Sequence, residues 1–165
     1  MKKPEMKHVI YIGLGTNLGD RKKNLASARR ALSPKVLIIK VSPIYETKPW
    51  GYADQPDFLN QVVKAKTDLE PTDLLAFLKQ CEVRLGRTPT FKNGPRQVDL
   101  DLLFYDDLIF ESAALTIPHP GIVKRGFVLA PMADIAPDFI HPENGKSIKQ
   151  LLAEVELSEV NKISP

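Results

Sequence analysis

Short apolar segments alternate with two longer segments of helical periodicity in the first half of the chain. Residues 8–14, 36–45 and 58–67 are rich in β-branched residues and are bounded by glycine, proline or polar residues, which favours strands. Residues 21–32 repeat leucine and alanine at helical spacing, and residues 71–85 carry an apolar stripe behind a proline suited to a first helical turn. The pattern therefore predicts three strands and two helices in this half.

The segment VDLDLLFY, residues 98–105, predicts a further strand, and a mostly helical tail follows that ends in a short helix over residues 147–156. The order strand, helix, strand, strand, helix, strand is that of split β-α-β units. It predicts an α+β fold, a ferredoxin-like α/β sandwich with an antiparallel sheet, helices on one face and a helical C-terminal extension. We expect the other face of the sheet to be free to carry a site. The 165 residues suit a single domain, residues 1–165.

Two carboxylates interrupt the apolar strand over residues 98–105. Because side chains alternate along a strand, one face is uniformly apolar and is expected to lie under the helices, namely Val98, Leu100, Leu102 and Phe104. Asp99 and Asp101 then share the opposite face, roughly 7 Å apart. At an effective dielectric constant near 20 they repel each other by roughly 2 kcal/mol, which a bound cation would relieve. The pair suits Mg²⁺ with phosphate oxygens, and two solvated aspartates on an exposed face remain the alternative.

Charge and cysteine content narrow the class of protein. The formal net charge of +3 is compatible with an anionic substrate and is too small to indicate nucleic acid. Cys81 is the one cysteine, so an internal disulfide is excluded. No apolar run approaches the roughly 20 residues of a membrane span, and a cytoplasmic protein is the expectation.

Cationic and polar side chains flank the acidic strand on both sides. The loop before it carries several basic residues, and a second polar group follows within ten residues of Thr116: Arg84, Arg87, Lys92 and Arg96, then Thr116, His119, Lys124 and Arg125. Cations beside a carboxylate and Mg²⁺ site are what a polyphosphate requires. They would equally serve to neutralise the aspartates.

Two further segments resemble ligand-binding motifs. The glycine-rich run GLGTNLGD matches neither the dinucleotide-binding spacing nor the P-loop spacing. Its glycines are therefore expected to shape the exit from the first strand, with Asn17 or Asp20 capping the following helix. Phe58 and Asn60 share one face of a strand, and an aromatic ring with an amide can hold a flat heterocycle. An ordinary sheet with scattered aromatic residues is the alternative for this pair.

Several strings together resemble the 6-hydroxymethyl-7,8-dihydropterin pyrophosphokinase family over about residues 8–155. They are GLGTNLGD, TKPWGYADQPDFLNQVV, LGR, GPRQVDLDLLFYDD and LTIPHPGIVKRGFVLAPMADIAP. The resemblance implies a ferredoxin-like sandwich that transfers the β,γ-diphosphate of ATP to the pterin hydroxymethyl group and releases AMP, in folate biosynthesis. It also implies two Mg²⁺ ions, two small-molecule substrates, no nucleic acid or membrane partner, and a monomer.

The resemblance further implies a role for particular residues. Asp99 and Asp101 would bind both metal ions and would act in catalysis together with Arg87 and Arg96. The pterin would be bound by Thr47, Lys48, Pro49, Trp50, Phe58, Asn60 and Phe127. ATP would be bound by Glu82, Arg87, Arg96, Leu102, Thr116, His119 and Arg125.

Two alternatives remain at this point. The same order of elements occurs in single-stranded RNA-binding modules, but those present aromatic residues on their central strands, whereas Asp99 and Asp101 would repel RNA. Another Mg²⁺-dependent phosphotransferase of nucleotides is compatible with the aspartate pair considered alone.

Overall fold

An antiparallel sheet forms the frame of the molecule. The computed structural model describes residues 6–49, 54–86 and 97–163, and within them six strands pair in the order β5-β1-β4-β3-β8, with β2 also paired to β4. The elements before residue 98 are β1 (His8–Thr16), α1 (Arg21–Leu32), β2 (Val36–Val41), β3 (Tyr45–Thr47), β4 (Phe58–Thr67) and α2 (Pro71–Arg84). Those after it are β5 (Asp99–Tyr105), β6 (Phe110–Glu111), β7 (Thr116–Ile117), η1 (Ile122–Lys124), α3 (Gly126–Ile135), α4 (Ile148–Leu152) and β8 (Val160–Lys162).

Two of the predicted elements, one helix and one strand, are confirmed with their exact bounds. The helix over 21–32 and the strand over 58–67 have the predicted bounds, and Asp20 is the cap of α1, accepting a hydrogen bond from the backbone N–H of Lys23. The continuous strand predicted over 36–45 is wrong. It is divided into β2 and β3 at Ser42, which is followed by a proline that has no N–H for a strand ladder. As a result β2 pairs with the second half of β4 and β3 with its first half.

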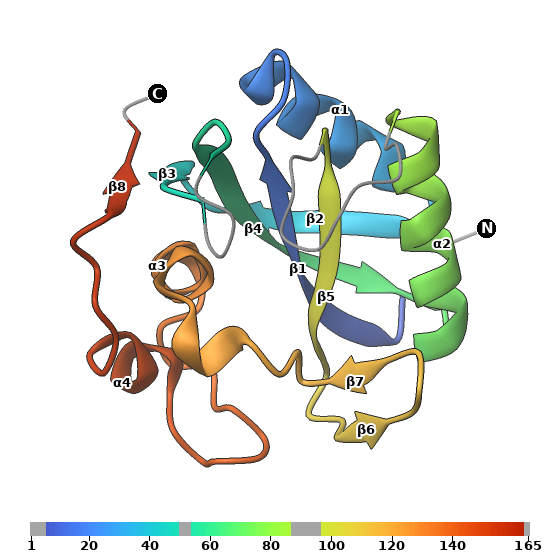
Figure 1. The fold of residues 1–165 in the computed structure, drawn as a ribbon. Helices are drawn as coiled ribbons and strands as arrows, with labels where there is room; N and C mark the ends of the chain where they lie inside the picture. Colours follow the sequence, from blue (N-terminus) through green and yellow to red (C-terminus); the bar gives the residue numbers. More distant parts are fainter. Residues whose placement is uncertain (1–5, 50–53, 87–96, 164–165) are drawn as a thin grey trace.

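Two apolar clusters occupy the two faces of the sheet. One packs α1 and α2 against β1, β4 and β5, with Leu25, Leu74 and Leu78 fully buried (Figure 1). The other packs η1, α3 and α4 against the opposite face. The expectation of a free second face is therefore wrong for the part that this tail covers, and among the described residues the face stays open near the start of β5.

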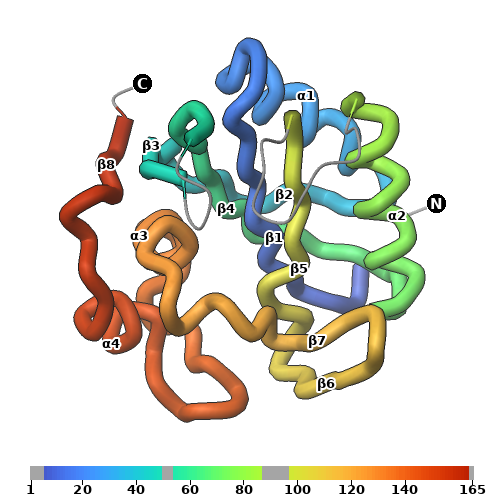
Figure 2. The backbone as a smooth tube through the Cα atoms, viewed as in Figure 1, coloured from blue at the N-terminus to red at the C-terminus, as the bar shows by residue number. Residues whose placement is uncertain are grey.

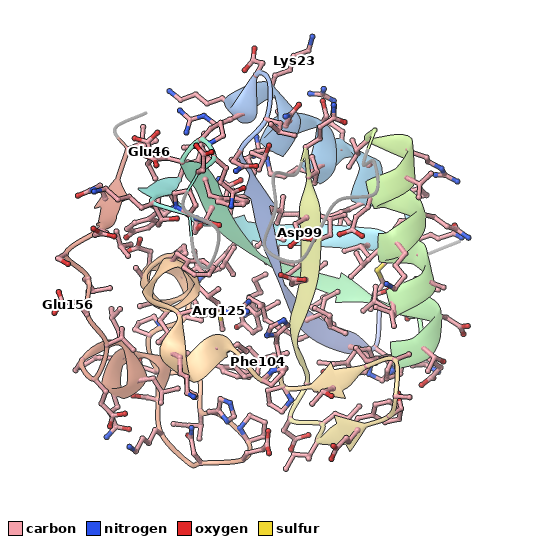
Figure 3. The ribbon with its side chains drawn as sticks, in the orientation of Figure 1. Lys23, Glu46, Asp99, Phe104, Arg125 and Glu156 are labelled. Atoms are coloured by element: carbon pink, nitrogen blue, oxygen red, sulfur yellow. The ribbon has the colours of Figure 1, made fainter. Side chains whose placement is uncertain are left out.

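A bulge in β5 joins these clusters. Ile12 pairs with Leu102 and Tyr11 with Phe104, so Leu103 is an extra residue in the ladder between β1 and β5. The predicted placement of Phe104 under the helices is wrong, because the extra residue reverses the alternation that precedes it. Phe104 instead packs in the α3 and α4 cluster, with its ring 4.7 Å from that of Phe139. Figure 3 shows it at the end of β5 remote from Asp99.

The turn after β5 ties the two neighbouring strands together. Asp106 has a φ of 48°, and its carboxylate accepts hydrogen bonds from the backbone N–H of Val9 at 2.8 Å and from His8 Nδ1 at 2.7 Å. The turn predicted at Asp106 and Asp107 is confirmed, but the first of these residues also acts as a link to β1.

We expect Asp106→Ala to lower the free energy of unfolding by about 1–2 kcal/mol. The change removes hydrogen bonds to a charged acceptor, and alanine lacks the short polar side chain that makes the left-handed region more favourable for aspartate. Urea denaturation measures the change. The matched control is Asp107→Ala, which should lie within about 0.5 kcal/mol of the parent. Equal losses for the two variants would contradict the assigned link.

In the part of the chain that the structure describes, no helix has the length and apolarity needed to cross a membrane.

Candidate active site

A pocket opens on the sheet face that α3 covers only in part. Its walls come from β1, β3, β4, β5 and the start of α3, which are distant in sequence but adjacent in space (Figure 1). The lining residues are Gly13, Leu14, Gly15, Thr47, Lys48, Phe58, Asn60, Gln61, Val62, Asp99, Asp101, Leu103, Arg125, Phe127 and Val128. The structure thus brings eight of the residues in the sequence-based site together in one pocket.

Glycines of β1 form the floor of the pocket. Gly13 pairs with Asp101 on one side and Val62 on the other, and Gly15 pairs with Asp99 and Asn60. A Cβ atom at Gly15 would lie 3.3 Å from Asn60 Oδ1. The expectation that these glycines shape the exit from the strand is wrong, because they lie within β1. Of the three glycines in GLGTNLGD, Gly19 lies in the turn between β1 and α1, with a φ of 71°.

The carboxylates of Asp99 and Asp101 line one side of this floor. Both residues are partly buried, and the register with β1 places each of them beside a glycine, so no neighbouring side chain on β1 fills the space in front of them. In Figure 3 Asp99 extends from β5, and Arg125 comes from the segment that leads into α3. Anionic and cationic side chains therefore face one pocket.

Two aromatic rings line the pocket from different elements. Phe58 begins β4 and Phe127 lies in the first turn of α3. The guanidinium of Arg125 lies 5.7 Å from the centroid of the Phe127 ring, a cation–π distance. These partly buried rings on two walls give the pocket apolar surface against which a flat molecule can pack.

A hydrogen bond fixes the amide of Asn60 at the pocket wall. Its Nδ2 donates to Thr47 Oγ1 at 2.9 Å, and both residues are buried. This leaves Oδ1, above Gly15, as a hydrogen-bond acceptor.

His119 is not among the lining residues, but it lies near enough to Asp99 for their charges to interact. Its backbone N–H donates to Leu103 O at 3.0 Å, and its Nδ1 accepts from the backbone N–H of Gly121 at 3.1 Å. Burial, followed by the charge of Arg125, lowers the pKa of His119, and Asp99 opposes this shift in part. The ring is consequently neutral at pH 7, with its proton on Nε2 as a hydrogen-bond donor.

Other residues of the sequence-based site lie elsewhere. Glu82 and Leu102 belong to the face under α1 and α2, where Glu82 Oε2 accepts from the backbone N–H of Leu100 at 2.8 Å. Thr116 lies in β7, and neither it nor Pro49 is among the lining residues. Trp50, Arg87 and Arg96 are outside the described residues.

Asn17 is a contributor that the sequence suggested only as a helix cap. It is 1% exposed, and its Nδ2 donates to Gln55 Oε1 at 2.8 Å and Pro56 O at 2.9 Å. These bonds anchor the segment that leads into Phe58. The sequence shows only an asparagine shortly after a predicted strand, and its burial, which requires hydrogen-bond partners, is visible only in the structure.

The donors in the pocket fit Mg²⁺ bound together with a phosphate ligand. Among the described residues there is no group of three or more acidic, histidine or cysteine side chains arranged to hold a metal ion. Asp99 and Asp101 supply two carboxylates on one side of the pocket, and Mg²⁺ commonly takes one or two carboxylates and completes its octahedron with water and substrate phosphates.

The fold and the pocket define the class first: a mixed α/β protein with an antiparallel sheet, whose pocket is lined by two carboxylates and two aromatic rings. The family model for 7,8-dihydro-6-hydroxymethylpterin-pyrophosphokinase matches residues 11–137, and the chain belongs to this family.

Individual relatives agree with this assignment. The chain is 42% identical over 145 residues to the 2-amino-4-hydroxy-6-hydroxymethyldihydropteridine pyrophosphokinase of Aquifex aeolicus, covering 88% of this chain and 91% of that protein. It is 44% identical over 135 residues to the folic acid synthesis protein FOL1 of Dictyostelium discoideum, covering 82% of this chain but a fifth (20%) of that longer protein. A crystal structure of Plasmodium falciparum HPPK-DHPS superposes with a TM-score of 0.74 at 17% identity, over 91% of this chain and 46% of that one, which shows a shared fold.

Proposed function

We propose that the chain transfers the β,γ-diphosphate of ATP to the hydroxymethyl oxygen of 6-hydroxymethyl-7,8-dihydropterin and releases AMP, as a step of folate biosynthesis. The observation that carries this proposal is the common pocket, in which the aspartate pair lies beside two aromatic rings and an amide. The names of the relatives support the same reaction.

The pterin fits the part of the pocket between Phe58 and Phe127. A flat bicyclic ring can stack on one or both aromatic faces. Asn60 Oδ1, held in place by Thr47, would accept a hydrogen bond from the N–H groups at the edge of the ring. Gly15 leaves room for the ring to approach the strand. We assign Pro49 and Trp50 to the same subsite on the family resemblance alone.

The diphosphate of ATP would lie across the aspartates. Asp99 and Asp101 would hold Mg²⁺, and when bound this metal would neutralise phosphate charge and lower the pKa of the attacking hydroxyl. Arg125, which lines the pocket, would be a cationic donor for phosphate oxygens, and the Nε2–H of His119 would be a neutral one. Arg87, Arg96 and Thr116 remain proposed contacts of ATP, as do Glu82 and Leu102.

In the reaction the hydroxymethyl oxygen attacks the β-phosphorus. A new O–P bond forms there while the bond from the β-phosphorus to the oxygen that bridges it to the α-phosphorus breaks. That oxygen leaves with AMP, and the proton of the hydroxyl is released to solvent. The chain contributes mainly position and charge, as is usual in phosphoryl transfer. Among the described residues that line the pocket, the stacking rings fix the pterin and Arg125 meets the charge of the transferred group.

The strand order also supports the finer description of the fold. The sequence β5-β1-β4 with β2 on the far side of β4 is the arrangement expected of a ferredoxin-like sandwich. The RNA-binding alternative is not favoured, because the open face at β1 and β5 carries glycines and two aspartates, whose negative charge would repel an RNA backbone.

The test is incubation of the protein with ATP, Mg²⁺ and 6-hydroxymethyl-7,8-dihydropterin. We expect AMP and the pterin diphosphate in equal amounts by chromatography. Release of ADP, or ATP turnover that does not depend on the pterin, would contradict the proposal.

The glycine floor leads to a separate prediction. We expect Gly15→Ala to weaken pterin binding by about 1 kcal/mol, at the lower end of overpacking costs, which is about fivefold in the dissociation constant. Fluorescence titration measures the affinity. Gly13→Ala is a graded comparison within the same floor: its Cβ would lie at an ordinary 3.5 Å from Leu103 Cδ2, so we expect a smaller loss of affinity than for Gly15→Ala. Equal affinity of the Gly15→Ala variant and the parent would remove this glycine from the binding surface.

A further inference from the structure

The C-terminal strand extends the sheet next to the pocket. β8 pairs with β3 in the register Tyr45 with Lys162, Glu46 with Asn161 and Thr47 with Val160. The backbone N–H of Ile163 donates to Ile44 O at 2.8 Å, which continues the same ladder. In Figure 2 the backbone after α4 runs past α3 and ends beside β3. The family model ends at residue 137, so this segment lies beyond the matched residues.

The same segment packs against the start of α3. A Cβ atom at Gly126 would lie 2.8 Å from Leu157 Cδ2, 3.2 Å from Glu156 O and 3.5 Å from Val160 Cγ2. The tail therefore lies so close to α3 that a side chain at this position would displace Leu157 and push the backbone at Glu156 away slightly. Gly126 stands between Arg125 and Phe127, which both line the pocket.

Asp134 links the tail, β3 and α3. Its carboxylate accepts a short hydrogen bond from the Tyr45 hydroxyl, and its other oxygen lies 3.4 Å from Lys162 Nζ. Lys162 also lies 5.6 Å from the centroid of the Tyr45 ring. Burial, followed by the hydrogen bond with Asp134, raises the pKa of Tyr45, so its hydroxyl stays protonated as the donor.

We propose that the tail segment, residues 156–163, is a positioning element for the pterin subsite: it ties β3 to the first turn of α3 and thereby sets the width of the slot that holds the ring. The inference rests on the proposed function. Thr47 and Lys48 belong to the wall that β8 extends. Phe127 belongs to the other wall, α3, against which the tail packs at Gly126. A ring stacked between two walls loses contact with one of them if their spacing relaxes, because dispersion attraction decays within about 1 Å of radial gap.

A positioning role for the tail predicts a loss of affinity for one substrate, the pterin, whereas a general structural role predicts a loss for both substrates. The aspartates of β5 and the histidine before η1 are held by β1 and β5, and the tail pairs with neither strand. Arg125, beside Gly126, is the proposed ATP contact nearest to the tail, whereas the aspartates lie away from it. Loosening the tail should therefore reduce affinity for the pterin much more than affinity for ATP.

Asn161 allows a test at a single exposed position. The bond from Ile163 N–H to Ile44 O, together with antiparallel alternation, makes Glu46 and Asn161 a hydrogen-bonded pair. Asn161→Pro removes the backbone N–H of residue 161 from this pair. The matched control Asn161→Thr retains the N–H in a residue suited to strands. We expect Asn161→Pro to raise the dissociation constant of 6-hydroxymethylpterin by about fivefold, a coupling in the range known for distant positions. The dissociation constant of ATP should stay within about twofold, and Asn161→Thr should match the parent in both.

A second pair of variants tests the same role of the tail without introducing a proline into β8. Asp134→Ala removes the link to both Tyr45 and Lys162, and Asp138→Ala is the control on a nearby exposed acid. Hydrogen exchange of residues 44–47 reports whether the tail has loosened.

Unchanged pterin affinity in Asn161→Pro or Asp134→Ala, with faster exchange in β3, would overturn the inference. Equal weakening of pterin and ATP binding would overturn it as well, since that result indicates general destabilisation. A parent protein that binds no 6-hydroxymethylpterin would instead contradict the proposed function.

Discussion

Asp99→Ala and Asp101→Ala should each lower kcat by at least about 10²–10³-fold, the range observed when one preorganised electrostatic contact to a transition state is removed. The physical reason is that the two carboxylates are the proposed metal ligands in the pocket, and no third acidic, histidine or cysteine side chain among the described residues is arranged to replace one of them. Steady-state formation of AMP at saturating ATP and pterin measures the effect.

The fold should survive these substitutions. Both aspartates are only partly buried at the sheet surface, and removal of one relieves the repulsion between them. Asp99→Asn and Asp101→Asn keep the shape of the side chain and should be about as inactive as the alanine variants, while Asp107→Ala is the acidic control with full activity. Loss of the native circular dichroism spectrum in the alanine variants would favour the alternative of a purely structural pair.

Phe58→Ala should weaken pterin binding by about 2–3 kcal/mol, the upper part of the range for removing one stacking aromatic residue, which is roughly 30–150-fold in the dissociation constant. Phe58 begins β4 at the pocket and supplies one of the two rings that line it. Fluorescence titration with 6-hydroxymethylpterin measures the affinity, and ATP affinity should be unchanged.

Phe58→Leu is the appropriate comparison, since it keeps apolar volume without an aromatic face. We expect a loss intermediate between the parent and Phe58→Ala. If the alanine variant binds the pterin as tightly as the parent, the ring is not part of the subsite.

Elements with strong local periodicity could be predicted from the sequence. α1 and β4 have the predicted bounds because each has an unbroken period and a distinct boundary, Asp20 before the helix and a polar, proline-bearing segment before the strand. The pocket residues on β4 and β5 could also be predicted, since alternation along a strand determines which residues share a face.

The errors arose where long-range pairing decides the structure. Nothing local in LDLLFY marks the bulge at Leu103, because the extra residue exists only relative to the register of β1. Gly13 and Gly15 were misplaced for the same reason: their function as a pocket floor depends on Asp101 and Asn60 on the two neighbouring strands. The tail over the second face is another long-range effect, since its apolar partners on the sheet include Tyr11 of β1 and Val62 of β4, which precede it by about 60 residues or more.

The bulge in β5 has a consequence for how the molecule unfolds. Leu102 belongs to one apolar cluster, Leu103 and Phe104 belong to the other, and Tyr105 belongs to the first again. Four consecutive residues of a single strand are thereby shared between cores that lie on opposite faces of the sheet. Melting of either core displaces the backbone on which the other one is built, so the two layers should lose structure together in one cooperative transition.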